Sequence, residues 1–248
     1  VITLFMFLAG VNFSLHFHAL RGRPGRYLKS EEFLLYSVLL GFGILLITIV
    51  LVATGSPPDQ EQGFLAALRM AAFQVTSIIT TTGFATADYE TWPAMSQIIL
   101  LICTFLGASA GSTGGGMKIL RVMLCFKFCY KEIFSLIHHH AVSHVKIAGK
   151  TVPDDVMRSI FGFLALYMGL FAVCAILLAG LGVDFTTAIG AVASCIGNIG
   201  PGLGSVGPTD NFAHVPAFGK LVLAFCMLLG RLELFTVLVL VFPSFWRK

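Results

Sequence analysis

The sequence predicts an all-α polytopic membrane protein made of repeated units, each a helix, a re-entrant pore loop and a second helix. Three observations predict this fold. First, 57% of the 248 residues are hydrophobic and only 11% are Asp, Glu, Lys or Arg, whereas an ordinary soluble domain has about 25% charged residues. Second, long uncharged segments recur along the chain, and third, Gly-rich segments separate them. This composition excludes a soluble enzyme, a disordered chain and a nucleic-acid-binding module as main interpretations.

Five segments are apolar enough to be considered as spans, since about 20 helical residues cross a bilayer. The first, residues 1–20, carries no Asp, Glu, Lys or Arg and resembles the end of a helix that began upstream, so we expect the chain to be part of a longer protein. The other predicted spans are 33–52, 94–117 (broken by glycines in its second half), 159–183 and 216–242 (interrupted by Arg231 and Glu233).

Two further apolar segments, 63–87 and 185–209, are poor spans because each ends in Thr-, Gly- or Asn-rich sequence. Irregular backbone at membrane depth is tolerated only where it is buried in protein or lines a wet cavity. Each segment therefore predicts a half-helix that enters the membrane and an extended strand that leaves it. The alternatives are an ordinary turn at 80–83 and a flexible linker at 197–207.

The basic residues indicate how the spans are oriented. Thirteen of the 16 Lys and Arg lie before the first full span, between the two halves or at the chain end, and this side is predicted to be cytoplasmic. The loops on the opposite side carry Asp and Glu without Lys or Arg. Basic and acidic loops then fall on opposite sides of the membrane only if both Gly-rich segments enter and leave it from the outer face.

The two Gly-rich segments align at an offset of 117 residues. This offset pairs Gly83 with Gly200, and it also matches Val75 with Val192, Ser77 with Ser194 and Ile79 with Ile196. The flanking spans repeat at nearly the same offset, which predicts two copies of one unit. We expect residues 1–32 to end a preceding helix and form a basic cytoplasmic loop, 33–150 to form one unit with its linker, and 151–248 to form the other.

Thr and Gly in these loops suit the binding of a partly dehydrated monovalent cation. Extended backbone supplies a column of carbonyl oxygens, Gly allows that backbone to point them inward, and Thr hydroxyls add oxygens at the inner end. The preceding half-helix aims its partially negative carbonyl end at the cavity below. A pore of this kind needs about four units around one axis. We therefore expect two more units to complete the pore. They are expected upstream in the same chain, and the alternative is that a second chain supplies them.

Four stretches resemble, in the correct order, the TrkH family of bacterial Trk-type potassium uptake subunits in the Trk/Ktr/HKT superfamily. They are TTTGFATADYETWP (80–93), GASAGSTGGGMKILRV (107–122), GNIGPGLGSVGP (197–208) and LGRLELFTVLVL (229–240). The resemblance covers the chain from about residue 10 to 248. It implies that the two units are the third and fourth of four, and hence that the chain is the C-terminal half of the pore.

The resemblance also implies which residues bind the K⁺ ion. The implied filter residues are Thr81, Thr82 and Gly83 in one unit and Asn198, Ile199 and Gly200 in the other. The second set departs from the Thr-rich pattern, which predicts an asymmetric filter of weaker selectivity. The resemblance further implies a multi-pass protein of the bacterial inner (plasma) membrane, a homodimer, and a TrkA-like cytoplasmic nucleotide-binding subunit that regulates potassium uptake. No nucleic acid is expected as a partner.

Glycine makes up five of the ten residues from 107 to 116, in the middle of a predicted span. Each glycine costs a helix about 1 kcal/mol relative to Ala, so we predict a break there, just below the filter. The resemblance implies that this break is a gate loop inside the membrane. The alternative is a close helix-packing face through Gly107 and Gly111. The predicted gating residues are Gly107, Gly111, Gly114, Gly115, Gly116, Lys118 and Arg231.

Arg231 lies within the last predicted span, where a charge costs about 2.5–3.5 kcal/mol on insertion scales. Pairing with Glu233 would offset this cost, but residues i and i+2 do not share a helix face. The preferred interpretation places Arg231 at the pore, as a barrier to cations or as a donor to gate-loop carbonyls. No catalytic set of residues is apparent, so no enzyme is predicted. The alternative to a channel-like uptake pore is a sodium- or proton-coupled symporter of the same fold.

Overall fold

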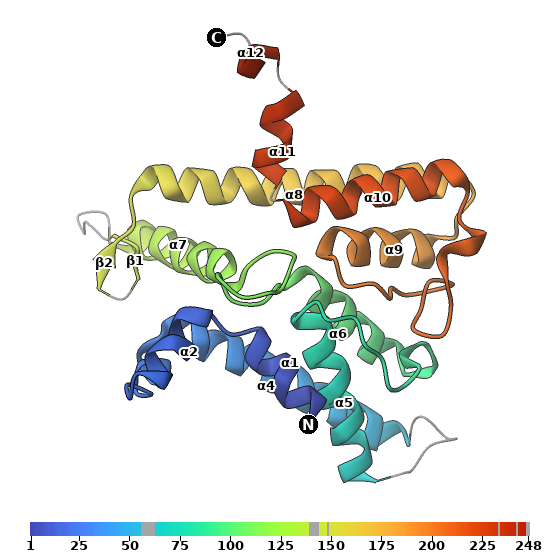
Figure 1. The fold of residues 1–248 in the computed structure, drawn as a ribbon, viewed down its shortest axis with the longest axis horizontal. Helices are drawn as coiled ribbons and strands as arrows, with labels where there is room; N and C mark the ends of the chain where they lie inside the picture. The colour runs from blue at the N-terminus through green and yellow to red at the C-terminus, as the bar shows by residue number, and fades with distance from the viewer. Residues whose placement is uncertain (56–62, 139–143, 148, 233, 242, 247–248) are drawn as a thin grey trace.

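The computed structural model describes residues 1–248 apart from 56–62, 139–143, 148, 233, 242 and 247–248 (Figure 1). The first unit contains α4 (Glu31–Thr54), α5 (Phe64–Ile79), the 3-10 helix η1 (Tyr89–Thr91), α6 (Ala94–Phe105) and α7 (Ile119–Ile137). The second contains α8 (Asp154–Gly180), α9 (Phe185–Gly197), η2 (Phe212–His214), α10 (Ala217–Arg231) and α11 (Leu234–Val241). The predicted order of helix, half-helix, loop and helix therefore occurs twice.

The remaining elements join or flank the two units. They are α1 (Ile2–Ala9), α2 (Phe13–Leu20), α3 (Arg26–Lys29), β1 (Lys146–Ile147), β2 (Lys150–Thr151) and α12 (Pro243–Trp246). The two strands form an antiparallel hairpin, with Lys146 opposite Thr151, in the linker between the units. This hairpin is not predicted from the sequence.

Two described helices, α4 and α8, are each long and apolar enough to cross a membrane, and they contain most of the predicted spans 33–52 and 159–183. Helix α4 begins where the Ser30 hydroxyl accepts a hydrogen bond from the Phe33 amide at 3.3 Å, a standard N-cap. It ends at Gly55, which has a left-handed φ of 60°. Helix α8 begins with Asp154 and Asp155 in its first turn, where negative charge favours the helix dipole.

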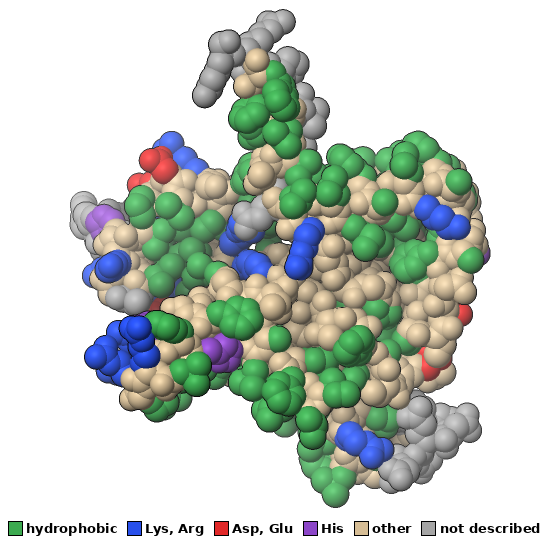
Figure 2. Space-filling model, in the orientation of Figure 1, with side chains coloured by type: hydrophobic (Ala, Val, Ile, Leu, Met, Phe, Trp, Pro, Cys, Tyr) green, Lys and Arg blue, Asp and Glu red, His purple; other side chains and the backbone are tan. Residues whose placement is uncertain are grey.

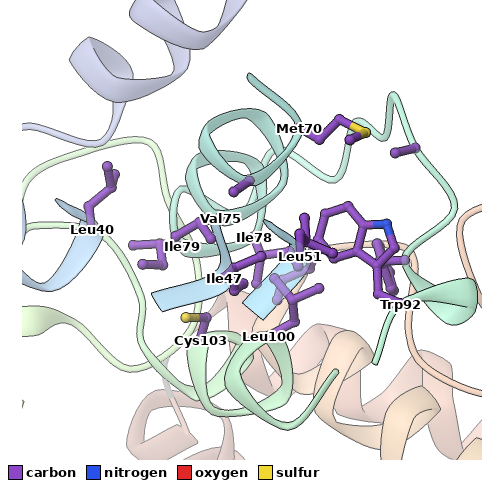
Figure 3. Close-up of a cluster of buried hydrophobic side chains, with 14 of the residues drawn as sticks. Leu40, Ile47, Leu51, Met70, Val75, Ile78, Ile79, Trp92, Leu100 and Cys103 are labelled. Carbon is purple, nitrogen blue, oxygen red and sulfur yellow. The ribbon is translucent and has the colours of Figure 1, made fainter. Parts of the chain in front are cut away.

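Each unit has its own hydrophobic core. In the first unit, Ile47 of α4, Val75 of α5 and Leu100 of α6 are buried together (Figure 3). In the second unit, Leu178 of α8 and Val192 of α9 belong to a separate buried cluster. Helix α6 of the first unit also contacts α9 of the second. The half-helices are thus held between the longer helices, as a re-entrant loop requires.

The expectation that residues 1–20 form the end of one helix is wrong. Helices α1 and α2 meet at a bend of 104°. Asn12 caps α2, its side chain accepting a hydrogen bond from the Ser14 amide at 2.9 Å. The bend is fixed from outside the segment, because the Phe13 amide donates to the carbonyl oxygen of Gly111 at 3.1 Å.

The predicted spans 94–117 and 216–242 are each divided into two helices. Residues 106–118 between α6 and α7 are not helical, so the alternative of a helix-packing face through Gly107 and Gly111 is also wrong. Helix α10 ends at Arg231, and α11 leaves it at a steep angle (Figure 1). Glu233, the alternative partner of Arg231 in the sequence, lies outside the described residues.

Candidate ion-conducting site

The filter segments predicted from the sequence follow the two half-helices directly. Helix α5 is buried from Gln74 to its end, and α9 is buried from Thr187 to its end except at one partly exposed position. Both helices stop inside the protein, and the chain then turns into residues 80–83 and 198–200. The structure thus gives each unit one buried half-helix whose carbonyl end faces a turn of Thr, Asn and Gly.

The backbone of the two filter segments repeats. Among the described residues, the non-glycine residues with positive φ are Thr81 at 54° and Asn198 at 57°. They are 117 residues apart, which is the offset of the sequence repeat. Gly83, at 77°, and Gly200, at 119°, repeat the positive φ at the same offset. A left-handed threonine is rare, and such strained backbone gathers at functional sites.

Hydrogen bonds within the two segments repeat as well. The Thr82 amide donates to the Ser77 carbonyl oxygen at 2.9 Å, and the Ile199 amide donates to the Ser194 carbonyl oxygen at 3.0 Å. The Ser194 hydroxyl also donates to the Gly200 carbonyl oxygen at 2.8 Å. The two serines occupy matched positions in the sequence repeat, and this match is the feature of the sequence that could have identified them. No role for them is predicted from the sequence.

The two filter segments lie against each other. A Cβ atom added to Gly83 would overlap the carbonyl oxygen of Ile199 and would lie 3.3 Å from Cδ of Pro201. On Gly200, by contrast, an added Cβ would meet no described atom within 4 Å. Gly83 is therefore the point of close backbone approach between the units, and no side chain fits there.

The threonine hydroxyls of the first filter segment make hydrogen bonds within the protein. The Thr80 hydroxyl donates to the Thr76 carbonyl oxygen at 2.7 Å, and its oxygen lies 2.9 Å from the Thr82 hydroxyl oxygen. The Thr81 hydroxyl oxygen accepts from the Gly115 amide at 2.7 Å. The hydroxyl oxygens of Thr81 and Thr82 are thus both engaged inside the protein, as is the Gly200 carbonyl oxygen.

Residues 106–118, which the sequence analysis predicts to be a gate loop and which keep that name below, pack against the ends of both predicted filter segments. Besides the Gly115 bond to Thr81, a Cβ added to Gly115 would lie 2.8 Å from the Gly197 carbonyl oxygen. One added to Gly114 would lie 3.3 Å from the Thr80 carbonyl oxygen. The space below the filter is thus occupied by backbone, which accounts for the glycines better than flexibility alone.

The two ends of the gate loop and its tip are fixed by different neighbours. The Gly107 amide donates to the Met117 carbonyl oxygen at 2.7 Å, which joins the two ends. Gly111, at the tip, lies against the side chain of Asn12, and Gly116 has a left-handed φ of 64°. All five predicted glycines therefore belong to one closed loop.

The first helices hold the gate loop in place. The Ser109 amide donates to the Gly10 carbonyl oxygen at 3.0 Å, in the bend between α1 and α2. The Ala110 amide donates to a carboxylate oxygen of Glu32 at 2.5 Å. Glu32 is not among the residues predicted from the sequence. The only signal in the sequence is an acidic residue at the start of a predicted span. That signal is not specific, because acidic residues are favourable at the N-terminus of any helix.

Basic side chains lie below the gate loop. Nη1 of Arg231 donates to the Thr113 carbonyl oxygen at 3.3 Å, and Nζ of Lys118 donates to the carbonyl oxygen of Gly114. A cavity of about 230 Å³ is lined by residues 112–116 with Lys118, Arg121 and Arg231. Figure 2 shows Lys and Arg side chains at a hollow in the middle of this face. The structure therefore brings the predicted gating residues together.

Arg231 reaches this position because of the residue before it. A Cβ added to Gly230 would overlap the carbonyl oxygen of Ile196, in the last turn of α9. Helix α10 thus approaches the end of the half-helix as closely as two backbones allow. The side-chain amide of Asn198 also donates to the Met227 carbonyl oxygen of α10 at 3.0 Å. Gly230 is not among the residues predicted from the sequence, although it is adjacent to the predicted arginine.

An acidic cluster lies on the opposite side of the filter segments. Burial raises the pKa of the Glu90 carboxyl to about 7, with further increases from Asp210, Asp88 and Asp184. The carboxyl group packs so closely on Gly207 of the second unit that a Cβ there would overlap it. Glu90 therefore changes charge near neutral pH.

Long apolar helices around two buried half-helices with strained filter segments define a helical membrane protein of the re-entrant pore-loop class. Comparison with known proteins gives the family. The family model for TrkH, described as a cation transport protein, matches residues 1–248. The chain belongs to the TrkH family.

Relatives of known name support this assignment. The chain is 38% identical over 248 residues to the Trk system potassium uptake protein TrkH of Halomonas elongata, and 36% identical over 249 residues to that of Escherichia coli K12. Both comparisons cover 100% of this chain and 50% of the relative. The crystal structure of the potassium transporter TrkH from Vibrio parahaemolyticus superimposes with a TM-score of 0.90 at 36% identity, covering 98% of this chain and 52% of that one. The chain thus spans about half the length of these relatives.

Proposed function

We propose that this chain forms two of the four units of a potassium uptake pore, the third and fourth, in the bacterial inner membrane. The observation that carries the proposal is the pair of filter segments, which repeat the same strained backbone 117 residues apart and contact each other at Gly83. Relatives named as potassium uptake proteins support K⁺ as the ion.

In this proposal the ion is bound by main-chain carbonyl oxygens of Thr81, Thr82 and Gly83 in one unit and of Asn198, Ile199 and Gly200 in the other. A K⁺ ion exchanges its water for these oxygens, and the ends of α5 and α9 add negative potential at the inner side. The hydrogen bonds of Ser77 and Ser194 hold the carbonyl column in place. Because the second segment lacks the threonines, the four sides of the filter are not equivalent, and selectivity is lower than in a symmetric filter.

The gate loop is proposed to be the barrier in the resting state. It fills the space below the filter, and Lys118 and Arg231 place positive charge where a cation would leave. A TrkA-like cytoplasmic nucleotide-binding subunit would open the pore by binding the basic inner surface and favouring a displaced loop. The proposed assembly is a homodimer of the whole protein, in which each copy has its own pore.

The proposed function is tested with the intact transporter in liposomes. We expect uptake of ⁸⁶Rb⁺ that K⁺ inhibits more strongly than Na⁺ does, driven by the membrane potential alone. Uptake that requires an inward sodium or proton gradient would instead establish the symporter. Absence of any preference for K⁺ over Na⁺ would contradict the assignment of the filter.

The Glu90 carboxyl predicts that uptake depends on external pH. Below about pH 7 this carboxyl is protonated, and above it a negative charge is added beside Asp88, Asp184 and Asp210. Negative charge at a pore mouth raises the local cation concentration. The KM for Rb⁺ should therefore fall roughly twofold to threefold as the external pH rises through 7.

Substituting Glu90→Gln should remove this pH dependence, because the amide does not titrate. The control is Glu132→Gln, which removes an exposed carboxyl of α7 that pairs with Lys131 at 3.7 Å, in the predicted cytoplasmic linker. We expect the control to keep the wild-type profile. An unchanged pH profile in Glu90→Gln would contradict the assignment of this group to the outer mouth.

A further inference from the structure

We propose that Tyr89 is a positioning residue for the filter of the second unit, although it belongs to the first unit. Its hydroxyl donates a hydrogen bond to the Gly202 carbonyl oxygen at 2.8 Å, across 113 residues of sequence. Gly202 lies two residues beyond Gly200, on the chain that leaves the filter. This inference rests on the proposed function, because it assigns a role in ion selectivity.

The position of Gly202 is tightly determined. Its amide donates to the Val206 carbonyl oxygen at 2.8 Å, and a Cβ added to it would lie 2.7 Å from the Gly190 carbonyl oxygen of α9. Pro201, which connects Gly202 to Gly200, lies close to Gly83 of the other filter segment. A shift of the Gly202 carbonyl would therefore be passed to the filter backbone of both units.

The two units support the outer part of their filters differently. In the first unit, the buried side-chain amide of Gln74 in α5 donates to the Ala87 carbonyl oxygen at 2.9 Å. The residue of α9 at the repeat offset is Ala191, which has no side-chain donor. In the second unit the Thr187 hydroxyl oxygen of α9 accepts from the Ser205 amide at 2.9 Å, and Tyr89 of the first unit supplies a further donor. This exchange accounts for how two loops of different sequence form one structure.

Tyr89 is itself rigidly held. It is 2% exposed, and its ring packs edge-on against Trp92 with the ring centres 6.4 Å apart. The side-chain amide of Gln97 donates to the Glu90 carbonyl oxygen at 2.7 Å and to that of Trp92 at 3.1 Å, which ties η1 to α6. The phenol therefore needs no further ordering to hold the Gly202 carbonyl, and removing it leaves a buried acceptor without this donor.

The test compares Tyr89→Phe with Tyr167→Phe in the intact transporter in liposomes. Tyr167 is 1% exposed, and its hydroxyl has no hydrogen-bond partner among the described residues, so the control removes a buried hydroxyl without removing a bond. We measure the uptake of ⁸⁶Rb⁺ and ²²Na⁺, the KM for each ion, and the thermal unfolding midpoint of each protein.

We expect Tyr89→Phe to lower the preference for Rb⁺ over Na⁺ roughly threefold to tenfold, the effect of one lost hydrogen bond. Tyr167→Phe should keep the preference, and both variants should unfold within a few degrees of the wild type. A wild-type preference in Tyr89→Phe would overturn the proposal, as would an equal loss in both variants. A loss that follows only a large fall in the unfolding midpoint would assign Tyr89 to stability alone. If the unmodified protein itself shows no preference, the proposed function fails first, and this inference fails with it.

Discussion

Replacing Gly83 with alanine is expected to reduce the preference of the intact transporter for Rb⁺ over Na⁺ roughly tenfold or more. Two effects add at this position. The φ of 77° is left-handed, and an L-residue pays about 1–2 kcal/mol there. The new Cβ would also overlap the carbonyl oxygen of Ile199. One methyl group therefore displaces a proposed ion ligand in each unit, and 1.4 kcal/mol already corresponds to a factor of ten.

Gly41→Ala is the matched control for Gly83→Ala. Gly41 lies within α4, where an added Cβ would meet no described atom within 4 Å, and alanine is favoured over glycine in a helix. This variant should keep its ion preference and lose no stability. Competition of Na⁺ with ⁸⁶Rb⁺ uptake measures both variants. Normal discrimination by Gly83→Ala would show that the contact between Gly83 and Ile199 has no part in ion selection.

The two turns that we propose as filter segments could be located from the sequence because their signal is local. An apolar half-helix followed by Thr and Gly suits few structures besides a re-entrant loop, and the repeat adds independent support. The offset of 117 residues, derived from a few identities, recurs in the φ angles of Thr81 and Asn198. The positive φ of Thr81 is strained and is held by distant residues, among them Gly115, whose amide binds the Thr81 hydroxyl. The sequence therefore predicts the position of these turns but not their backbone conformation.

The supports of the filter and of the gate loop could not be predicted in the same way. Tyr89 and Glu32 both bind main-chain groups, at Gly202 and Ala110, which are 113 and 78 residues away. Every non-proline residue carries the same amide and every residue the same carbonyl. The partner therefore leaves no pattern of residue types in the sequence, and only the fold identifies it.

The bend between α1 and α2 illustrates the same limit. Residues 1–20 are apolar and contain a single glycine, which favours a continuous helix. The break is stabilised by the Phe13 amide bond to Gly111 and by the close contact of Gly10 with the Tyr36 hydroxyl. Tertiary contacts outweigh local helix preference here. The gate loop and this bend are therefore two parts of one packed structure.

The second large effect is expected at the gate. Arg231→Ala removes the hydrogen bond to the Thr113 carbonyl oxygen and a positive charge from the cavity below the loop. We expect ⁸⁶Rb⁺ flux in the absence of the cytoplasmic partner to rise roughly fivefold to tenfold. A hydrogen bond that involves a charged group contributes a net stabilisation of about 1.5–3 kcal/mol, and the exposure of Arg231 reduces this value toward the 1.4 kcal/mol that corresponds to a factor of ten. The preference for Rb⁺ over Na⁺ should stay near the wild-type value, because the filter backbone is held by other bonds. A point substitution is chosen because deleting the loop would also remove the Gly115 amide that binds Thr81.

Two further variants separate the possible roles of Arg231. The Lys220→Ala variant removes a cation at the other end of α10, where the Lys220 ammonium donates to the Ala213 carbonyl oxygen at 2.9 Å. We expect this variant to leave the resting flux unchanged. Arg231→Gln keeps a side-chain donor but removes the charge. If Arg231→Gln stays closed, the bond to Thr113 holds the loop shut. If its flux rises as in Arg231→Ala, charge in the cavity is the barrier. A resting flux that stays low in Arg231→Ala, in a protein that unfolds at the wild-type temperature, would show that this arginine does not control the gate.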